Sequence, residues 1–201
     1  MATRTSKKLC AILLFAVVLI GGYVAIRYGM AHYYKKAYPQ KYSELVEKYA
    51  DQYGVDHNLV YAVIRTESGF VHTSVSHVGA SGLMQITEDT FNWAKTRMKD
   101  QRPITYTDDI FNEEINVQYG VYILSLLLDE YQSTNTALVA YHAGRGTAQK
   151  YLKDPQKTPN GIDIQNVPPG ETKEYIEKVT QTQHTYECIY TKGEKQDGKQ
   201  K

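Results

Sequence analysis

An uncharged apolar run near the N-terminus constrains this chain more than any other feature of its sequence. The run covers Leu9–Ile26, "LCAILLFAVVLIGGYVAI", and follows the basic residues Arg4, Lys7 and Lys8. In a helix, its eighteen residues span roughly 27 Å, close to the hydrocarbon thickness of a bilayer. Basic residues in front of such a run favour an N-terminus that stays inside. The pattern predicts one transmembrane anchor, with the rest of the chain exported.

A cleaved signal peptide is the alternative interpretation of the same run. The tripeptide "GMA", Gly29–Ala31, offers small residues for cleavage. The apolar run is long for a signal peptide and this cleavage site lies late, so the uncleaved anchor is favoured. The anchor predicts a protein of the cell membrane with its C-terminal domain outside, whereas cleavage predicts a secreted domain.

The remainder of the chain is long enough for one domain with a proper core. The last residues, "TKGEKQDGKQK", contain no apolar side chain and are expected to be disordered. We expect a cytoplasmic N-terminus (1–8), a transmembrane anchor (9–26), a linker (27–40), a folded domain (41–190) and a tail (191–201).

Every regular element of the folded domain has the apolar spacing of a helix, which predicts a mainly α fold. Asp56, Thr87 and Asn112 stand where N-caps are expected. The run Val121–Leu128 is apolar on nearly all sides, which predicts the central buried helix. The polar loop 70–83 is expected to hold a small β-turn or ribbon. The expected helices are 42–53, 57–67, 88–98, 113–132, 134–144 and 171–190.

Charge and cysteine content exclude several classes of function. The 23 basic and 22 acidic residues nearly balance, so charge gives no argument for a nucleic-acid partner. Cys10 and Cys188 lie at opposite ends of the chain, which makes an internal disulfide implausible. The histidines are scattered without zinc-ligand spacing, so we expect no metal and no zinc peptidase activity. No cofactor is expected.

Glu67 stands out because it ends a helix that otherwise buries apolar side chains. It lies one turn beyond Val63 and one turn before Phe70, on the core-facing side of the helix. Burial there disfavours the ionised carboxylate and keeps the acid protonated near neutral pH. Glu67 therefore suits the acid of a glycoside-cleaving enzyme.

Glycosidases ordinarily need a second carboxylate, and the sequence offers none with a clear role. The remaining acids in this part of the chain occupy contexts typical of caps and exposed turns: Glu88, Asp89, Asp108 and Asp109. A single carboxylate is sufficient when the substrate supplies the nucleophile, as the N-acetyl group of an amino sugar can.

Five segments carry a resemblance to a known family. In chain order they are "VIRTESGF", "SHVGASGLMQI", "NVQYGVYIL", "ALVAYHAG" and "VPPGETKEYIEKV". Their succession resembles the motifs of lytic transglycosylases of the soluble-lytic-transglycosylase type, from about Tyr42 to Val179. These proteins share a lysozyme-like helical fold with goose-type lysozymes. The resemblance implies a mainly α, lysozyme-like helical domain, here preceded by one transmembrane helix.

The resemblance also implies a reaction on peptidoglycan glycan strands. The family cleaves the β-1,4 bond between N-acetylmuramic acid and N-acetylglucosamine and leaves 1,6-anhydromuramic ends. In that reaction Glu67 is the single acid and base: it protonates the glycosidic oxygen, then accepts the proton of the muramoyl 6-hydroxyl. A hydrolytic muramidase and a catalytically idle wall-binding scaffold are the alternatives. A partner in an envelope-spanning assembly stays open.

Four further site residues follow from the resemblance. Ser76 matches a loop serine that contacts the muramoyl residue, and Gln85 matches a cleft glutamine that hydrogen-bonds sugar. Tyr141 matches a tyrosine that stabilises developing positive charge or positions the N-acetyl group. Glu171 matches a second cleft glutamate that binds substrate. Their structural alternatives are a turn serine, a structural amide, a core tyrosine and a helix N-terminal acid.

The chain departs from the family pattern at several positions. His142 stands where the family has Asn, and His77 where it has Pro. Thr87 and Glu88 replace a Met-Pro pair, and Lys173 replaces an Arg. Lysine lacks the bidentate fork of arginine, so an ion pair at that position is weaker. These departures concern subsite preference and loop shape rather than the acid.

Overall fold

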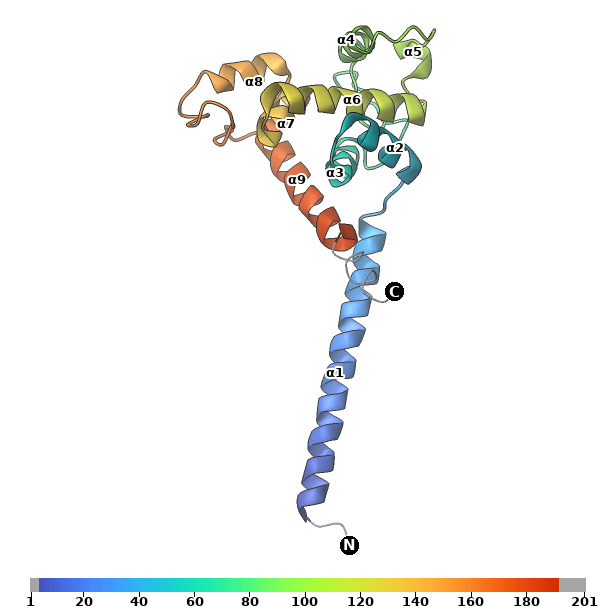
Figure 1. Cartoon of the computed structure of the whole chain (residues 1–201), viewed down its shortest axis with the longest axis vertical. Coiled ribbons are helices and arrows are strands. Elements are labelled where there is room, and N and C mark those ends of the chain that lie inside the picture. The colour runs from blue at the N-terminus through green and yellow to red at the C-terminus, as the bar shows by residue number, and fades with distance from the viewer. Residues whose placement is uncertain (1–3, 192–201) are drawn as a thin grey trace. The chain divides into compact units, whose positions relative to one another are not determined.

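The computed structural model describes residues 4–191, and no strand of a sheet occurs among them. The described residues are mostly helical (Figure 1), which confirms the predicted mainly α class. Residues Gln40–Cys188 form one compact unit. The described residues on either side, 4–39 and 189–191, belong to a second unit.

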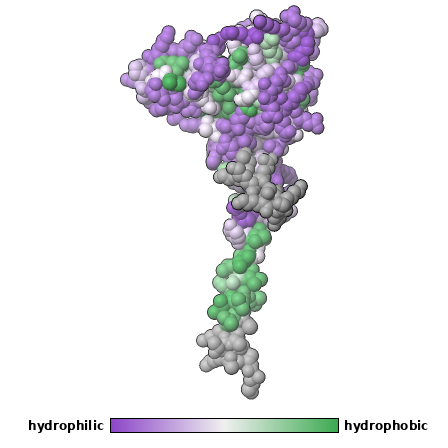
Figure 2. Space-filling model, in the orientation of Figure 1, coloured by the Kyte–Doolittle hydropathy of each residue, from purple (hydrophilic) through white to green (hydrophobic). Residues whose placement is uncertain are grey.

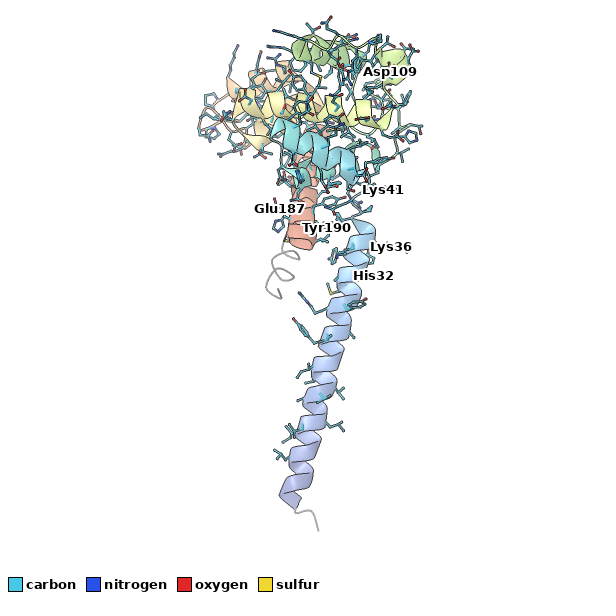
Figure 3. All side chains as sticks on the ribbon, turned by 45° about the vertical axis from the view of Figure 1, so that its right-hand side comes forward. His32, Lys36, Lys41, Asp109, Glu187 and Tyr190 are labelled. Atoms are coloured by element: carbon cyan, nitrogen blue, oxygen red, sulfur yellow. The ribbon has the colours of Figure 1, made fainter. Side chains whose placement is uncertain are left out.

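Helix α1, Arg4–Ala37, carries the apolar run. Its part Ile12–Ala37 contains a window of mean hydropathy 2.0 and is long and apolar enough to cross a membrane. None of that window is buried within the protein, and its apolar residues form the green stretch in Figure 2. His32 and Lys36 lie in the last turns of α1 (Figure 3).

The end of α1 lies beyond the predicted end of the anchor. Residues 27–37, most of the predicted linker, continue the same helix. The sequence there contains no proline before Pro39, so nothing interrupts the backbone hydrogen bonds. Residues 192–201, nearly all of the predicted tail, lie outside the described part of the chain.

The unit Gln40–Cys188 contains the six helices expected from the sequence and two that were not expected. Its elements are α2 (Ser43–Tyr53), α3 (His57–Ser68), α4 (Glu88–Met98), α5 (Tyr106–Asp109), α6 (Glu113–Tyr131), α7 (Thr134–Ala143), α8 (Arg145–Leu152) and α9 (Glu171–Tyr186). A π-helical turn, Glu187–Thr191, follows α9 in the chain and extends past the last residue of this unit. The unexpected helices are α5, which is a single turn, and α8, which buries only Ala148. Neither presents an apolar stripe that periodicity could detect.

The predicted N-caps are confirmed. The side chain of Asp56 accepts a hydrogen bond from the backbone N–H of Leu59 at 2.8 Å. Thr87 and Asn112 cap α4 and α6 in the same way. These bonds satisfy backbone donors that the first helical turn leaves without a partner, so local sequence determines where three helices begin.

Helix α6 is the central helix, as predicted, and packs against α2, α4 and α7. Its residues Val117, Val121 and Leu124 are fully buried. At Gly120 a β-carbon would collide with the side chain of Met84, so glycine permits the loop before α4 to lie directly on α6.

Asn116 of α6 holds this loop through three hydrogen bonds to backbone groups. Its Oδ1 accepts from the N–H of Met84 at 2.8 Å, and its Nδ2 donates to the carbonyls of Ser81 and Ile110 at 3.0 and 2.9 Å. Gly82, with φ +81°, passes so close that a β-carbon would collide with the Asn116 amide. The loop therefore has one shape that a buried amide enforces.

Two isolated antiparallel bridges lie within the loop, which confirms the expected small ribbon. They join Val75 to Ser81 and Ser81 to Ile86. The loop that contains the ribbon follows α3, which packs against α9. Glu67 near the end of α3 lies beside Tyr175 near the start of α9. Stacking of Tyr61 on Tyr186, with ring centroids 5.3 Å apart, forms part of the contact between these two helices.

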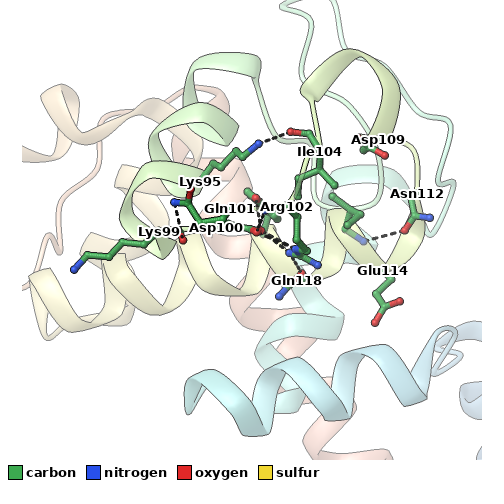
Figure 4. A network of polar contacts seen from close by, with 12 residues as sticks. Lys95, Lys99, Asp100, Gln101, Arg102, Ile104, Asp109, Asn112, Glu114 and Gln118 are labelled. Carbon is green, nitrogen blue, oxygen red and sulfur yellow. Dashed lines mark hydrogen bonds and ion pairs between the residues drawn. The ribbon is translucent and has the colours of Figure 1, made fainter.

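A polar network holds the segment after α4 against α6 (Figure 4). The Arg102 guanidinium donates to Asp100, with Nε 2.9 Å from Oδ1, and also to Oε1 of Gln118 at 2.7 Å. The Tyr119 hydroxyl donates to the same carboxylate at 2.9 Å. These donors hold the pKa of Asp100 well below its usual range. The network fixes the first residues after α4 against α6.

Replacement of Asn116 by alanine is expected to destabilise the protein strongly. The change leaves one backbone N–H and two backbone carbonyls without this partner in a buried place, at a cost of about 3 kcal/mol in the free energy of unfolding. The measurement is urea unfolding followed by circular dichroism. Asn112→Ala, which removes only an exposed N-cap, is the matched control and should cost about 1 kcal/mol. Equal losses for the two variants would contradict the role assigned to Asn116.

Candidate active site

A cleft of about 450 Å³ opens on the unit Gln40–Cys188. Its walls come from the end of α3, from residues 69–87 between α3 and α4 (the ribbon loop), and from α4, α6, α7 and the start of α8. Four of the five predicted site residues line it: Glu67, Ser76, Gln85 and Tyr141. Tertiary structure thus brings together residues that are separated by more than seventy positions in the chain.

Glu67 lies in the last turn of α3 with its carboxyl group largely removed from solvent. Burial raises the pKa of Glu67 from its ordinary value of 4.5 to about 7. The Tyr175 hydroxyl and the positive charge of Lys178 act in the opposite direction, but burial prevails. At neutral pH a large fraction of Glu67 is therefore protonated, as a general acid requires.

Tyr175, on α9, is a residue of this site that the sequence interpretation missed. Its side chain is buried, and its hydroxyl lies beside Glu67. The hydroxyl opposes part of the rise that burial causes in the pKa of that carboxyl. Among the described residues, this hydroxyl has no hydrogen-bond partner with good geometry. Burial and the Glu67 charge raise the pKa of Tyr175 well above 10, so it stays neutral. In the sequence, the signal for its burial was its position one helical turn before the apolar Val179, on the same side of the helix.

Tyr141, on α7, is the second tyrosine beside Glu67. Its hydroxyl donates to the carbonyl of Met84 at 2.9 Å. Burial, followed by the negative charge of Glu67, raises its pKa well above the usual 10. The hydroxyl hydrogen is therefore used in the bond to the Met84 carbonyl, and the phenol stays un-ionised beside Glu67.

Gln85 has a backbone φ of 48° and holds the ribbon loop through its amide. Its Nε2 donates to the carbonyls of Ser74 and Gly82 at 3.0 and 2.9 Å. Because both partners are acceptors, the orientation of the amide is fixed, and both of its hydrogens are used. Only Oε1 remains available, so Gln85 can accept a hydrogen bond from a ligand in the cleft but cannot donate one.

Ser76 and Glu171 occupy different surroundings. The Oγ of Ser76 accepts from the backbone N–H of Ala80 at 3.1 Å, which leaves its hydroxyl hydrogen for a ligand. Glu171 is exposed in the first turn of α9 and is not among the residues that line the cleft. Its charge acts on His142, which does line the cleft.

The cleft contains a second carboxylate, Asp89, in the exposed first turn of α4. The sequence predicted an ordinary acid at a helix N-terminus. Asp89 does lie there, and it also lines the cleft. Of the other candidate acids, Glu88, Asp108 and Asp109 are not among the lining residues. Among the described residues, no three His, Cys, Asp or Glu side chains gather as a metal site would require.

Titration of Glu67 is expected to make stability depend on pH. The folded-state pKa lies above the unfolded value, so the folded protein holds a proton between pH 4.5 and 7 that the unfolded chain releases. Stability is therefore lost as pH rises through this window. Glu67→Gln should be about as stable as wild type at pH 4 and more stable by about 3 kcal/mol at pH 8.

Urea unfolding of wild type and variant across this pH range is the measurement. Glu47→Gln, which removes an exposed glutamate of α2, is the matched control and should differ little from wild type at every pH. A stability difference for Glu67→Gln that does not change with pH would contradict the burial of this acid.

Comparisons with known proteins agree with this geometry. Membrane-bound lytic murein transglycosylase C of Sodalis glossinidius is 29% identical over 175 residues, which cover 77% of this chain and 48% of that protein. The protein of the same name from Pectobacterium atrosepticum is 28% identical over 184 residues, 81% of this chain and 51% of that protein. The chain thus spans about half the length of the curated relatives it matches.

Solved structures share the fold. An inactive mutant of lytic transglycosylase Slt from Pseudomonas aeruginosa superposes with a TM-score of 0.66 at 25% identity, over 77% of this chain and 25% of that chain. The 70 kDa soluble lytic transglycosylase of Escherichia coli gives 0.68 at 24% identity, over 78% of this chain and 25% of that chain. A lysozyme-like helical domain preceded by one long apolar helix is thereby confirmed as the fold.

The family model of the transglycosylase SLT domain matches residues 44–163, a range that holds Glu67, Ser76, Gln85 and Tyr141. This match extends over more than half of the chain, and the chain belongs to the transglycosylase SLT domain family.

Proposed function

We propose that this protein is a membrane-anchored lytic transglycosylase that cleaves the glycan strands of peptidoglycan. The observation that carries the proposal is the sheltered carboxyl of Glu67, with a pKa of about 7, in a cleft large enough for sugar residues. Relatives named membrane-bound lytic murein transglycosylases support the substrate class.

In the proposed reaction, Glu67 acts first as the acid. Its proton passes to the glycosidic oxygen between N-acetylmuramic acid and N-acetylglucosamine as the bond to the anomeric carbon breaks. The substrate N-acetyl group supports the anomeric carbon from the other face. Glu67, now a carboxylate, takes the proton of the muramoyl 6-hydroxyl while that oxygen forms the 1,6-anhydro ring. Protons balance, and no water enters the product.

The other cleft residues have roles that their hydrogen bonds suggest. Tyr141 stays neutral and presents its phenol oxygen to developing positive charge or to the N-acetyl group. Gln85 accepts from a sugar N–H or hydroxyl through Oε1, and Ser76 donates its hydroxyl hydrogen to the muramoyl residue. Glu171 acts from outside the lining, through its charge on His142.

The proposed location is the membrane, with the catalytic unit outside. Helix α1 has the length and composition of a single span, and basic residues precede its apolar run. Such an anchor would confine cleavage to peptidoglycan within reach of the membrane surface.

A hydrolytic muramidase is the second candidate, and Asp89 favours it. A second carboxylate in the same cleft could activate a water molecule on the opposite face of the sugar ring. The two candidates differ in their products, since hydrolysis leaves reducing ends and transglycosylation leaves anhydro ends.

Digestion of purified peptidoglycan by the full chain in mild detergent is expected to release 1,6-anhydromuropeptides, identified by mass spectrometry. Glu67→Gln should lower the rate about a thousandfold because it removes the only acid at the scissile bond. Asp89→Asn should keep most of the activity.

Glu47→Gln is the matched control for loss of a glutamate and should behave as wild type. Reducing ends from the wild type, together with an inactive Asp89→Asn variant, would replace the proposal by a muramidase. Unchanged activity of Glu67→Gln would remove the assignment of the acid.

The pH dependence should report the protonation of Glu67. We expect kcat/KM to be constant between pH 5 and 6 and to fall tenfold per pH unit above about 7, because the acid must carry its proton. The rate is measured on the same peptidoglycan across pH 5 to 9.

The alkaline limb should persist in His142→Asn, which removes one of the two histidines that line the cleft. Burial lowers the pKa of His142 below its usual 6.5, so this residue is largely neutral where the limb begins. A limb that begins near pH 4.5, or one that disappears in His142→Asn, would contradict the assignment to Glu67.

A further inference from the structure

Trp93 and Arg145 line the cleft and play no part in the reaction described above. Trp93 lies on α4 and is partly exposed, and Arg145 is the first residue of α8. The guanidinium carbon of Arg145 lies 5.4 Å from the centre of the indole. At this distance the positive charge is attracted by the ring face. An aromatic surface and a cation thus stand side by side in the wall of the cleft.

Arg145 retains donors for another acceptor. Glu130 accepts through both carboxylate oxygens, but only from Nη2, at 2.8 and 3.0 Å. The Glu130 carboxylate raises the pKa of Arg145, and the nearby Tyr131 hydroxyl adds to this effect without the geometry of a hydrogen bond. No described residue accepts from Nη1, and the side chain remains 41% exposed. A guanidinium with a free terminal nitrogen at a cleft wall is suited to a carboxylate.

The backbone beside Arg145 favours the same charge. Gly144, also in the cleft wall, is the N-cap of α8 and supplies no side-chain acceptor to the first turn. That turn contains no acidic residue. The positive end of the helix therefore adds to the guanidinium, in contrast to α4, whose first turn carries Glu88 and Asp89.

We propose that Trp93 and Arg145 form a subsite for a sugar ring that bears a carboxylate. The indole packs against the apolar face of the ring, and Nη1 of Arg145 donates to the carboxylate. The inference rests on the proposed function, which supplies the muramoyl residue as the sugar. Its carboxylate comes either from the lactyl group, in strands without peptides, or from the stem peptide.

Trp93 is the only tryptophan in the chain, so its fluorescence reports on this subsite alone. The experiment uses the full-length Glu67→Gln variant in mild detergent, which prevents cleavage, and titrates it with two pairs of ligands. The first pair is the disaccharide of N-acetylglucosamine and N-acetylmuramic acid, with its lactyl carboxylate free or converted to the methylamide. The second pair is the same disaccharide with a stem peptide, with its carboxylates free or amidated.

The free carboxylate is expected to bind about tenfold more tightly than the amide in at least one pair, with a saturable change in tryptophan emission. The pair that shows the preference identifies the source of the carboxylate. Adding Arg145→Gln should reduce the ratio to about one and leave the affinity for the amide within about twofold. Arg145→Lys, which keeps the charge but loses the fork, should retain a ratio of about three.

Arg97→Gln is the matched control. The Arg97 guanidinium lies 5.8 Å from the centre of the same indole but does not line the cleft, so the tenfold preference should persist. Circular dichroism and thermal unfolding show whether Arg145→Gln still folds after loss of its ion pair with Glu130. If it does not fold, the Arg145→Lys ratio decides in its place, and a ratio still near ten overturns the proposal.

Equal affinity for acid and amide in both pairs, or a preference that survives in folded Arg145→Gln, would overturn this subsite. So would the absence of any fluorescence change. These outcomes concern binding and are independent of the products formed by the wild type. A wild type that releases no muropeptides refutes the proposed activity, whereas the titration refutes only the subsite.

Discussion

The buried amide of Asn116 is the interaction on which the rest of the cleft depends. It ties three backbone groups to α6, and the N–H of Met84 is one of them. The carbonyl of the same Met84 residue holds the Tyr141 hydroxyl, so one amide on the central helix governs both the loop and the α7 side of the site. The arrangement requires glycine at two positions. A β-carbon at Gly82 would collide with Asn116, and one at Gly120 would collide with Met84.

Backbone carbonyls of the ribbon loop orient much of the polar surface of the site. Gln85 donates to two of them, Tyr141 to a third, and the hydroxyl of Ser68, beside Glu67, to the carbonyl of Leu83 at 2.8 Å. Side chains fixed in this way lose little freedom when a ligand enters, which is the physical meaning of preorganisation. Glu67 differs from these side chains, because its raised pKa comes from burial rather than from hydrogen-bond donors.

Local features of the sequence predicted what local physics controls. The caps Asp56, Thr87 and Asn112 lie where they were expected, because each bond joins residues three positions apart. Helix α8 was missed because its sequence is polar and buries only Ala148. The family motifs led to Glu67, Ser76, Gln85 and Tyr141, and the cleft contains all four, whereas Glu171 lies outside its lining. Asp89 was taken for a cap acid, because periodicity does not show which exposed acids face a cleft.

The sequence by itself determined the long apolar helix, the helical class and the core-facing phase of Glu67, since each follows from composition or from spacing within a few turns. Only the tertiary structure decided how deeply that acid is buried, that Tyr175 of α9 stands beside it, and that Trp93 meets Arg145 in one wall. The reason is physical: a pKa and a cleft depend on which distant segments exclude water together, and helical periodicity carries no information about partners on other helices.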